Sequence, residues 1–340
     1  MPLWTNLITP IEATGFARVE LEDRERAKGS LSRFLPNVFS PSRYISFKVG
    51  DHGLVDEALY RELDARPEIG RGEKVQTRAI RLPNISRNEP IDEQTQDNLK
   101  YVSDDVLRKS IIQTIRRTVW SICDRQERVR GSVIHAGKAI SEQHNYSLND
   151  DFGRDAALQF TAPQLWSDPS TDRLQQLADW VDLYAQKNNG VEPGVILMSR
   201  GAFAALCRGA QFRQVQPGGA TLPAGNQAVL QYVDGQGLPP IEQYNRATKS
   251  GLVLPKEYVY FLPAPVDPFS EEPSALGATY WGDTVTATLP EFGLEPAETS
   301  GIVVGVHRND RIPATIEVEA DSTGEPVAAD ANKAMAVKVL

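Results

Sequence analysis

The sequence predicts an α+β protein with an extended beginning and a more compact remainder. A helical stripe of unusual length lies in residues 103–131, and strand-like alternation lies before it at 43–49. Short apolar strands separated by Gly and Pro fill 276–340, and the chain ends on such a strand. A terminus of that kind is usually tied into a sheet, so the end of the chain is expected to belong to the folded body.

Residues 1–42 are predicted to form an arm. A helix is expected to start at Thr9 and Pro10 and to run to about Ala27, because proline suits the first helical turn. The run 20–26 is almost entirely charged, so this helix has little apolar face of its own. Two interpretations remain open, a solvated surface helix and an extension that packs on a neighbouring subunit.

Residues 43–83 are predicted to form a long two-stranded projection. Residues 43–49 alternate cleanly between apolar and polar side chains, and 75–82 form a second strand-like run. The connection between them, 50–74, is longer than most structureless connections in compact domains, which are often functional at such lengths. An isolated two-stranded hairpin is marginal in water, so the projection is expected to need a partner surface.

The segment 84–160 contains the strongest helix prediction, at 103–131. Ser103 is a good N-cap, and Gly131 is a plausible stop. At about 1.5 Å per residue the helix would be roughly 40 Å long, which suits a structural spine. Strands are expected to follow at 133–140 and 155–161. The apolar stripe consists of Leu107, Ile111, Ile115, Val119 and Ile122.

The other faces of this helix carry a row of arginines, which resembles a nucleic-acid-binding helix. Acidic residues, Asp124 and Glu127, lie close to that row, so the sequence favours a solvated, salt-bridged face. The arginines are Arg116, Arg117, Arg125, Arg128 and Arg130.

Residues 161–262 are predicted to form a compact α/β domain. Its first helix is expected after a cap at Ser170 or Thr171, and Ser199 caps a second, shorter helix. Strands are expected at 195–198, 228–233 and 258–262. Residues 263–340 are then expected to return to the domain of the long helix through strands at 302–306, 315–318 and 335–339.

No cluster of residues indicates catalysis, a cofactor or a metal, so the sequence predicts no catalytic, cofactor-binding or metal-binding residues. The histidines have no ligand spacing, and Cys123 and Cys207 are expected to be buried thiols, with a disulfide or a reactive thiol as the alternatives. The Gly-rich run 217–220 lacks the Lys and Ser or Thr of a phosphate loop. The acidic pairs 150–151 and 271–272 are expected to face water. The histidines are His52, His135, His144 and His307.

Charge and hydropathy exclude further classes. The net charge is −9, and the first 131 residues hold 22 Lys and Arg against 20 Asp and Glu, whereas the rest hold 14 against 25. A protein that grips nucleic acid shows a basic face, and this sequence shows none overall. No run approaches the ~20 apolar residues of a membrane span, and the opening residues do not read as a signal peptide, so no membrane partner is expected.

Several short segments of the sequence are similar to segments in the proteins of one viral family. Read together, they resemble the lambda-type "major capsid protein E" family of tailed bacteriophages. The resemblance extends over nearly the whole chain, although none of the segments is a catalytic signature. The segments are 32–37 (SRFLPN), 63–70 (LDARPEIG), 277–282 (GATYWG), 302–307 (IVVGVH), 324–327 (GEPV) and 336–340 (AVKVL).

The resemblance implies the Hong Kong 97-type capsid fold. In that fold an N-terminal arm, an extended loop called the E-loop, a peripheral domain with a spine helix, and an axial domain follow one another. They would correspond to 1–42, 43–83, 84–160 and 161–262, with a return to the peripheral domain over 263–340.

The resemblance also implies a structural function without enzymatic activity or cofactors. Copies would form hexamers and pentamers that close into an icosahedral shell around double-stranded DNA, without sequence-specific binding. The implied partners are a scaffolding protein, a portal and a decoration protein. The shell would be assembled in the cytoplasm of a host bacterium and would form the capsid of the virion.

Two other functions remain as alternatives. An encapsulin-type nanocompartment shell would share the fold and enclose an enzyme cargo. A soluble α/β enzyme would use the domain at 170–260, but the sequence lacks a catalytic set. Some tailed-phage shells also crosslink Lys to Asn, and Lys74 and Asn309 are residues of those types, but no motif connects them.

Overall fold

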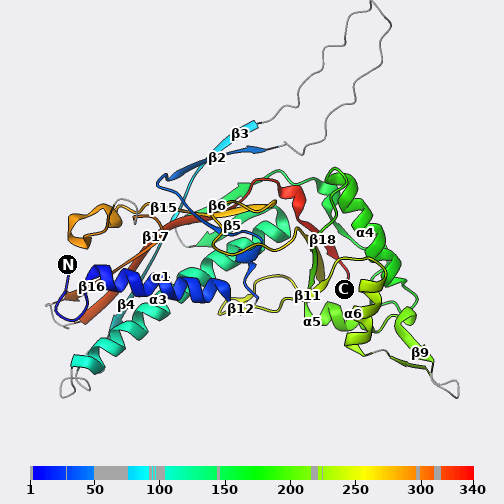
Figure 1. The fold of residues 1–340 in the computed structure, drawn as a ribbon, viewed down its shortest axis with the longest axis horizontal. Helices are drawn as coiled ribbons and strands as arrows, with labels where there is room; N and C mark the ends of the chain where they lie inside the picture. The colour runs from blue at the N-terminus through cyan, green and yellow to red at the C-terminus, as the bar shows by residue number, and fades with distance from the viewer. Residues whose placement is uncertain are drawn as a thin grey trace, which may run out of the picture.

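The computed structural model describes residues 3–27, 29–49, 76–91, 94, 96, 104–143, 146–215, 221–223, 225–295, 299–309 and 315–340. They form an elongated molecule with two sheets (Figure 1). The first sheet and the two longest described helices occupy one end, and the second sheet with three shorter helices occupies the other.

The first sheet joins the beginning of the chain to its end. Its longest strand, β17 (Thr315–Ala328), pairs antiparallel with β15 (Gly277–Gly282), β16 (Ile302–Asn309) and β4 (Asn84–Ile91). On the far side of β15, the short strand β1 (Asn37–Phe39) runs parallel to it. The predicted strands at 302–306 and 315–318 are therefore confirmed, and both are longer than predicted.

Two helices cover this sheet. The predicted first helix is α1 (Pro10–Arg26), which begins with a capping box between Thr9 and Glu12. It packs on the long helix α3 (Asp104–Ala136) and on β16 of its own chain. The prediction that the arm either stays solvated or finds its partner on a neighbouring subunit is therefore wrong for the inner face of α1. The apolar residues buried along α1 are Pro10, Ala13, Ala17 and Leu21.

The long helix α3 is confirmed, but it does not stop at Gly131. It continues to Ala136, and Gly137, with φ +67°, follows it in the left-handed conformation that ends many helices. Gly131 serves packing instead, because a Cβ there would lie 2.6 Å from Cγ1 of Val253. The predicted strand at 133–140 is thus wrong for its first half, which is helical.

Among the described residues, four two-stranded ribbons stand outside the two main sheets, and two of them are longer than the rest. β2 (Tyr44–Val49) pairs antiparallel with β3 (Gln76–Arg81), as predicted, and projects from the body (Figure 1). The ring of Phe47 anchors this ribbon on Phe152, 5.5 Å away between centroids. The predicted connection 50–74 lies outside the described residues.

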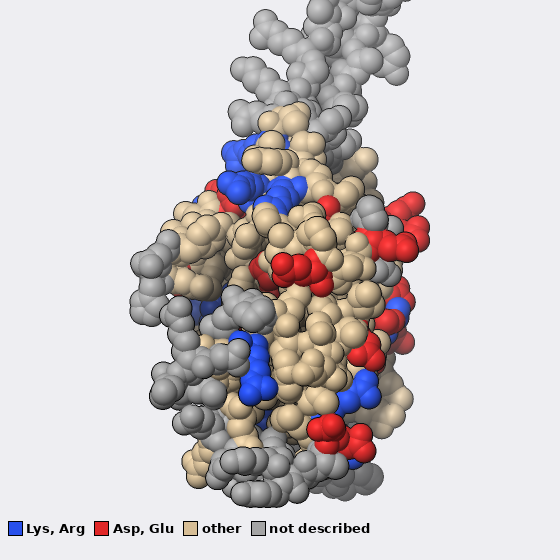
Figure 2. All heavy atoms as spheres, turned by 90° about the vertical axis from the view of Figure 1, so that its left-hand side faces the viewer, with Lys and Arg blue, Asp and Glu red and all other residues tan. Residues whose placement is uncertain are grey.

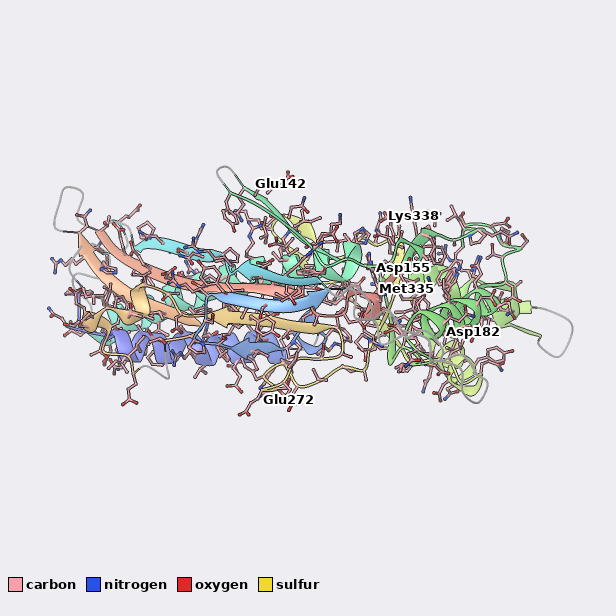
Figure 3. The ribbon with its side chains drawn as sticks, turned by 90° about the horizontal axis from the view of Figure 1, so that it is seen from above. Glu142, Asp155, Asp182, Glu272, Met335 and Lys338 are labelled. Carbon is pink, nitrogen blue, oxygen red and sulfur yellow. The ribbon has the colours of Figure 1, made fainter. Side chains whose placement is uncertain are left out.

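The second ribbon follows α3 directly. β5 (Lys138–Gln143) pairs antiparallel with β6 (Tyr146–Asp151), and within the described residues neither strand joins a larger sheet. Below, β5 and β6 are called the hairpin. In the view from above, the hairpin stands off from the body, with Glu142 close to its end (Figure 3).

The second sheet has the order β11 (Ile241–Gln243), β8 (Val195–Met198), β14 (Tyr258–Leu262), β18 (Met335–Lys338) and β7 (Gln159–Thr161). The predicted strands at 195–198 and 258–262 are confirmed. The last strand, β18, pairs with β14 and β7. Residues 263–340 therefore return to the first sheet only in part, because their final strand belongs to the second sheet.

Three helices pack on one face of the second sheet: α4 (Arg173–Lys187), α5 (Arg200–Cys207) and α6 (Asn226–Gly235). Ser199 caps α5 as predicted, whereas Asp172 is the N-cap of α4 in place of Ser170 or Thr171. The predicted strand at 228–233 is wrong, since α6 occupies these residues. The opposite face of the sheet packs toward the C-terminal half of α3.

Short elements complete the described chain. They are η1 (Leu31–Arg33), η2 (Ala156–Leu158), η3 (Ala210–Phe212), β9 (Arg213–Val215), β10 (Thr221–Pro223), β12 (Ala247–Thr248), β13 (Gly251–Leu252), η4 (Thr286–Thr288), η5 (Pro290–Phe292) and η7 (Ala331–Lys333).

Candidate functional site

The described residues contain no group of three or more His, Cys, Asp or Glu side chains that could hold a metal ion. Two of the four histidines, His52 and His144, lie outside the described residues. His135 packs edge-on against Tyr258, and its Nδ1 lies 3.1 Å from the hydroxyl of Tyr260. Burial lowers the pKa of His135, so this ring is a neutral packing residue at neutral pH.

The other candidates from the sequence also have structural surroundings. Cys123 and Cys207 are free and buried, and burial raises the pKa of both thiols, which keeps them protonated. Asp151 forms an ion pair with Lys138 at 2.8 Å within the hairpin. Glu271 and Glu272 are exposed. Of the crosslinking pair, Asn309 ends β16, while Lys74 lies outside the described residues.

The most unusual group of charges lies where α1, α3 and the first sheet meet. Arg130, Glu25 and Glu127 are each fully buried. The guanidinium of Arg130 donates to Glu25 and Glu127, and it also donates to Asn37 at 2.6 Å and to Thr279 at 2.8 Å. We call these five residues the junction network. It connects α1, α3, β1 and β15, so one side chain of the spine helix holds the arm and the first sheet together.

Glu127 makes further hydrogen bonds, both to the segment after α1 and to the segment after β11. Its Oε1 accepts from the hydroxyl of Tyr244 at 2.7 Å and from the backbone N–H of Leu31 at 2.9 Å. The guanidinium of Arg246 lies 3.3 Å from the same oxygen. Burial, followed by the charge of Glu127, raises the pKa of Tyr244, so its hydroxyl remains a donor.

The prediction of a solvated, salt-bridged arginine row is therefore wrong for Arg130 and confirmed for Arg116. Arg125 and Arg128 are half-buried and donate to neutral groups. Arg116 is 47% exposed and pairs with Glu20 of α1 at 2.6 Å. Exposed pairs of this kind contribute little, whereas breaking a buried pair is strongly destabilising. The sequence could not distinguish these two cases, because the partners of Arg130 lie in distant segments.

A second group of buried polar atoms lies beneath the hairpin. Gly324, Glu325 and Pro326 of β17 line a cavity of about 280 Å³ together with residues of α3, β4 and the hairpin. Glu325 is fully buried, and neither of its carboxyl oxygens has a hydrogen-bond donor among the described residues. Burial, followed by the charge of Asp150, raises the pKa of Glu325 to about 9. Sequence reasoning did not identify this carboxyl, and nothing local distinguishes it from an exposed glutamate.

The outer surface offers exposed apolar residues near the arm and the projecting ribbon. Ile11 and Val19 on the outer face of α1 are 55% and 58% exposed, and Tyr44 at the start of β2 is 61% exposed. Figure 2 shows the end of the molecule where α1 begins, with acidic and basic side chains scattered over a largely uncharged face. In the part of the chain that the structure describes, no helix is long and apolar enough to span a bilayer.

Comparisons with known proteins identify a family from the sequence and similar folds among solved structures. The sequence profile described as "phage major capsid protein E" matches residues 37–270. A prophage protein of Escherichia coli CFT073, described as a capsid protein, has a TM-score of 0.61 at 16% identity, covering 96% of this chain and 99% of that chain. A phage-related protein of Bordetella bronchiseptica RB50 has a TM-score of 0.55 at 12% identity, covering 96% and 94%. No curated protein sequence matches significantly.

Proposed function

Because the chain belongs to the phage major capsid protein E family, we propose that its copies form hexamers and pentamers that close into an icosahedral shell around double-stranded DNA. The observation that carries this proposal is the family match, which spans more than half of the chain. The same match favours a phage shell over an encapsulin-type compartment.

The fold is the Hong Kong 97-type capsid fold that the sequence resemblance implied. Within it we assign 1–42 to the arm and 43–83 to the E-loop. The peripheral domain comprises the first sheet with α1 and α3, and the axial domain comprises the second sheet with α4, α5 and α6. In this assignment β18 belongs to the axial domain, so the end of the chain connects both domains.

Assembly needs surfaces that a single chain leaves uncovered. The ribbon β2–β3 projects from the body and is fastened to it near Phe47, which suits an element that lies across a neighbouring subunit. The exposed apolar residues of α1 and β2 are further candidates for contacts between copies. The role of the shell is structural.

The remaining partners follow from the same role. A scaffolding protein, a portal and a decoration protein would be separate chains, and assembly would take place in the cytoplasm of the host bacterium. The net charge of −9 suits a container for packed DNA, because phosphate contacts would otherwise hold the duplex to the wall.

Electron microscopy of the expressed full-length chain, with and without a co-expressed scaffolding protein, tests self-assembly. We expect shells, tubes or rings of subunits. In a separate experiment, particles purified from host cells that the phage has lysed should contain double-stranded DNA. An enzyme cargo in place of DNA would favour the encapsulin-type alternative. Small monodisperse monomers under every condition would contradict the proposal.

A deletion tests the E-loop assignment. A chain without residues 50–74, with β2 and β3 joined by a short turn, should keep its folded body, because every strand of both main sheets is retained. It should fail to form shells. A control that replaces 50–74 by a Gly–Ser segment of equal length separates the effect of sequence from that of connection length. Normal shells from both variants would overturn the assignment.

A further inference from the structure

The cavity beneath the hairpin is lined by one carboxyl group and one guanidinium group that do not form an ion pair with each other. Its walls come from β17, from the C-terminal half of α3, from the start of β4 and from both strands of the hairpin. Glu325 on β17 and Arg125 on α3 both line it. Neither forms an ion pair within 4 Å among the described residues, so this cavity holds two uncompensated groups of opposite charge type.

On the acidic side, the surroundings of Glu325 disfavour its ionised form. The carboxyl is fully buried, and the charged group that acts on it is another carboxylate, Asp150 of the hairpin. The hydrogen bond with Asp150 satisfies only the protonated form of Glu325, so an ionised carboxylate here would lack a donor among the described residues. The amide oxygen of Gln126, which lines the same cavity, is also buried and without a donor among the described residues.

On the basic side, the guanidinium of Arg125 is bound to the hairpin. Its Nη1 donates to the hydroxyl of Ser141 at 3.3 Å. The amide oxygen of Gln143, in the orientation that satisfies both groups, accepts from the three guanidinium nitrogens at 2.9–3.2 Å. Both partners are neutral, and burial together with the charge of Arg128 lowers the pKa of Arg125. This cation is therefore placed where a carboxylate could compete for it.

The hairpin is anchored in the core by Ala139 and Leu148, which are buried. Nearer its end, Ser141 and Gln143 are held by Arg125. The two strands of the hairpin pair only with each other in the described structure, and a two-stranded ribbon is marginal alone. Besides Arg125, its described hydrogen bonds to other elements include Ile140 N–H to Ser132 Oγ at 3.0 Å and Arg78 to the backbone oxygen of Asp151. A change at Arg125 would therefore loosen the outer end of the hairpin, from Ser141 to Gln143.

We propose that Arg125 is a latch with two positions. In the arrangement described here it holds the hairpin through Ser141 and Gln143. In the second arrangement its guanidinium turns into the cavity and pairs with the ionised carboxylate of Glu325, and the outer end of the hairpin is released from α3.

Proton occupancy of Glu325 selects between the two arrangements. A protonated carboxyl can donate to Asp150 and offers no charge to Arg125, whereas an ionised one attracts the guanidinium strongly in this buried place. Other charged groups face the same region, and each sets the balance. They are Asp150 and Tyr146 on β6, Arg128 on α3, and Arg81 on β3, which acts on Tyr146.

Hydrogen–deuterium exchange of the hairpin amides in the full-length chain tests the latch. Pulse labelling at pH 7 and pH 10 is compared with the exchange rate of an unstructured reference peptide at each pH. The ionised fraction of a group with a pKa of about 9 rises from about 1% to about 90% between these values, so protection of the hairpin should fall about tenfold or more. If the exchange rate of the hairpin amides rises from pH 7 to pH 10 only as much as that of the reference peptide, protection is unchanged and the proposal is overturned.

Substitutions identify the two groups. Arg125→Gln should reduce protection of the hairpin about tenfold already at pH 7, and Glu325→Gln should abolish the pH dependence. Arg117→Gln is the matched control, because Arg117 lies on the exposed face of the same helix and does not line the cavity, and it should keep the wild-type pattern. If Glu325→Gln keeps the wild-type pH dependence, the latch is refuted. The wild-type comparison needs no substitution, so it decides the matter even if a variant does not fold.

Discussion

Replacing Arg130 with methionine removes the central cation of the junction network. Methionine keeps the length of the aliphatic stem but offers neither charge nor donors. We expect this variant to lose about 3–5 kcal/mol of unfolding free energy, which is the usual cost of breaking a buried ion pair by removing one partner.

The magnitude follows from what each former partner retains. Glu127 keeps Arg246 at 3.3 Å and the hydroxyl of Tyr244, so its charge stays compensated. Glu25 keeps only a hydrogen bond from Ser30 at 3.4 Å among its described side-chain contacts, and its other oxygen already lacks a partner. The uncompensated buried charge is therefore that of Glu25, and one such charge accounts for the expected loss.

Urea denaturation of the unassembled chain, followed by circular dichroism, measures the loss. Arg116→Gln is the matched control on the same helix, because its pair with Glu20 is half exposed, and it should cost less than about 1 kcal/mol. The double variant Arg130→Met with Glu25→Gln should recover about half of the loss or more, since it removes the uncompensated carboxylate. A cost for Arg130→Met as small as that of the control would refute the reasoning, and so would a double variant without recovery.

Two further predictions concern stability. Because the pKa of Glu325 is raised to about 9 from 4.5, its ionisation opposes folding increasingly as pH rises between these values. Glu325→Gln should therefore stabilise the chain, on the order of 4 kcal/mol at pH 7.5, with a flatter pH dependence in urea titrations; an unchanged slope would contradict this. Gly131→Ala should cost about 1–3 kcal/mol by thermal unfolding, because its Cβ would lie 2.8 Å from the backbone oxygen of Val253. Gly15→Ala, a control on the open face of α1, should stabilise slightly, and equal effects of both would contradict the packing role.

The sequence predicted elements whose signals are local. The long helix α3 was predictable because its cap and its apolar stripe lie within one continuous segment. Its end was not, because a glycine can stop a helix or admit a close neighbour, and only the position of Val253 shows that Gly131 does the latter. Similarly, Ser199 identified the start of α5, whose cap hydrogen bond connects residues three apart.

The segment of α6 shows how a local pattern can mislead. Its apolar and aromatic residues between 228 and 233 favoured a strand. Gly225 at its N-cap gives no side-chain hydrogen bond, so no capping signal marked the start of the helix. The buried positions are Val229 and Val233, four residues apart, which is the helical spacing that distinguishes the two structures.

The two groups of buried polar residues lay beyond sequence reasoning for a different reason. Arg130 meets Glu25 and Thr279, which are 105 and 149 residues away in the chain, and Glu325 meets a hairpin more than 170 residues before it. Their burial depends on which strands pair with which. A single sequence contains no local trace of that pairing, so every charged residue on α3 looked equally solvated.

The packing of α1 on its own chain limits which surfaces are left for contacts between copies. Ala13, Ala17 and Leu21 recur every four residues, and the small alanines let α1 approach α3 closely, so a narrow apolar stripe is enough. The arm therefore needs no neighbouring copy to bury its inner face. Moving it during shell formation would expose Glu25 and Arg130, and separating such a buried pair costs several kcal/mol. Contacts between copies would have to offset that cost, so we expect the arm to stay docked while the projecting ribbon and the outer face of α1 meet the neighbouring subunits.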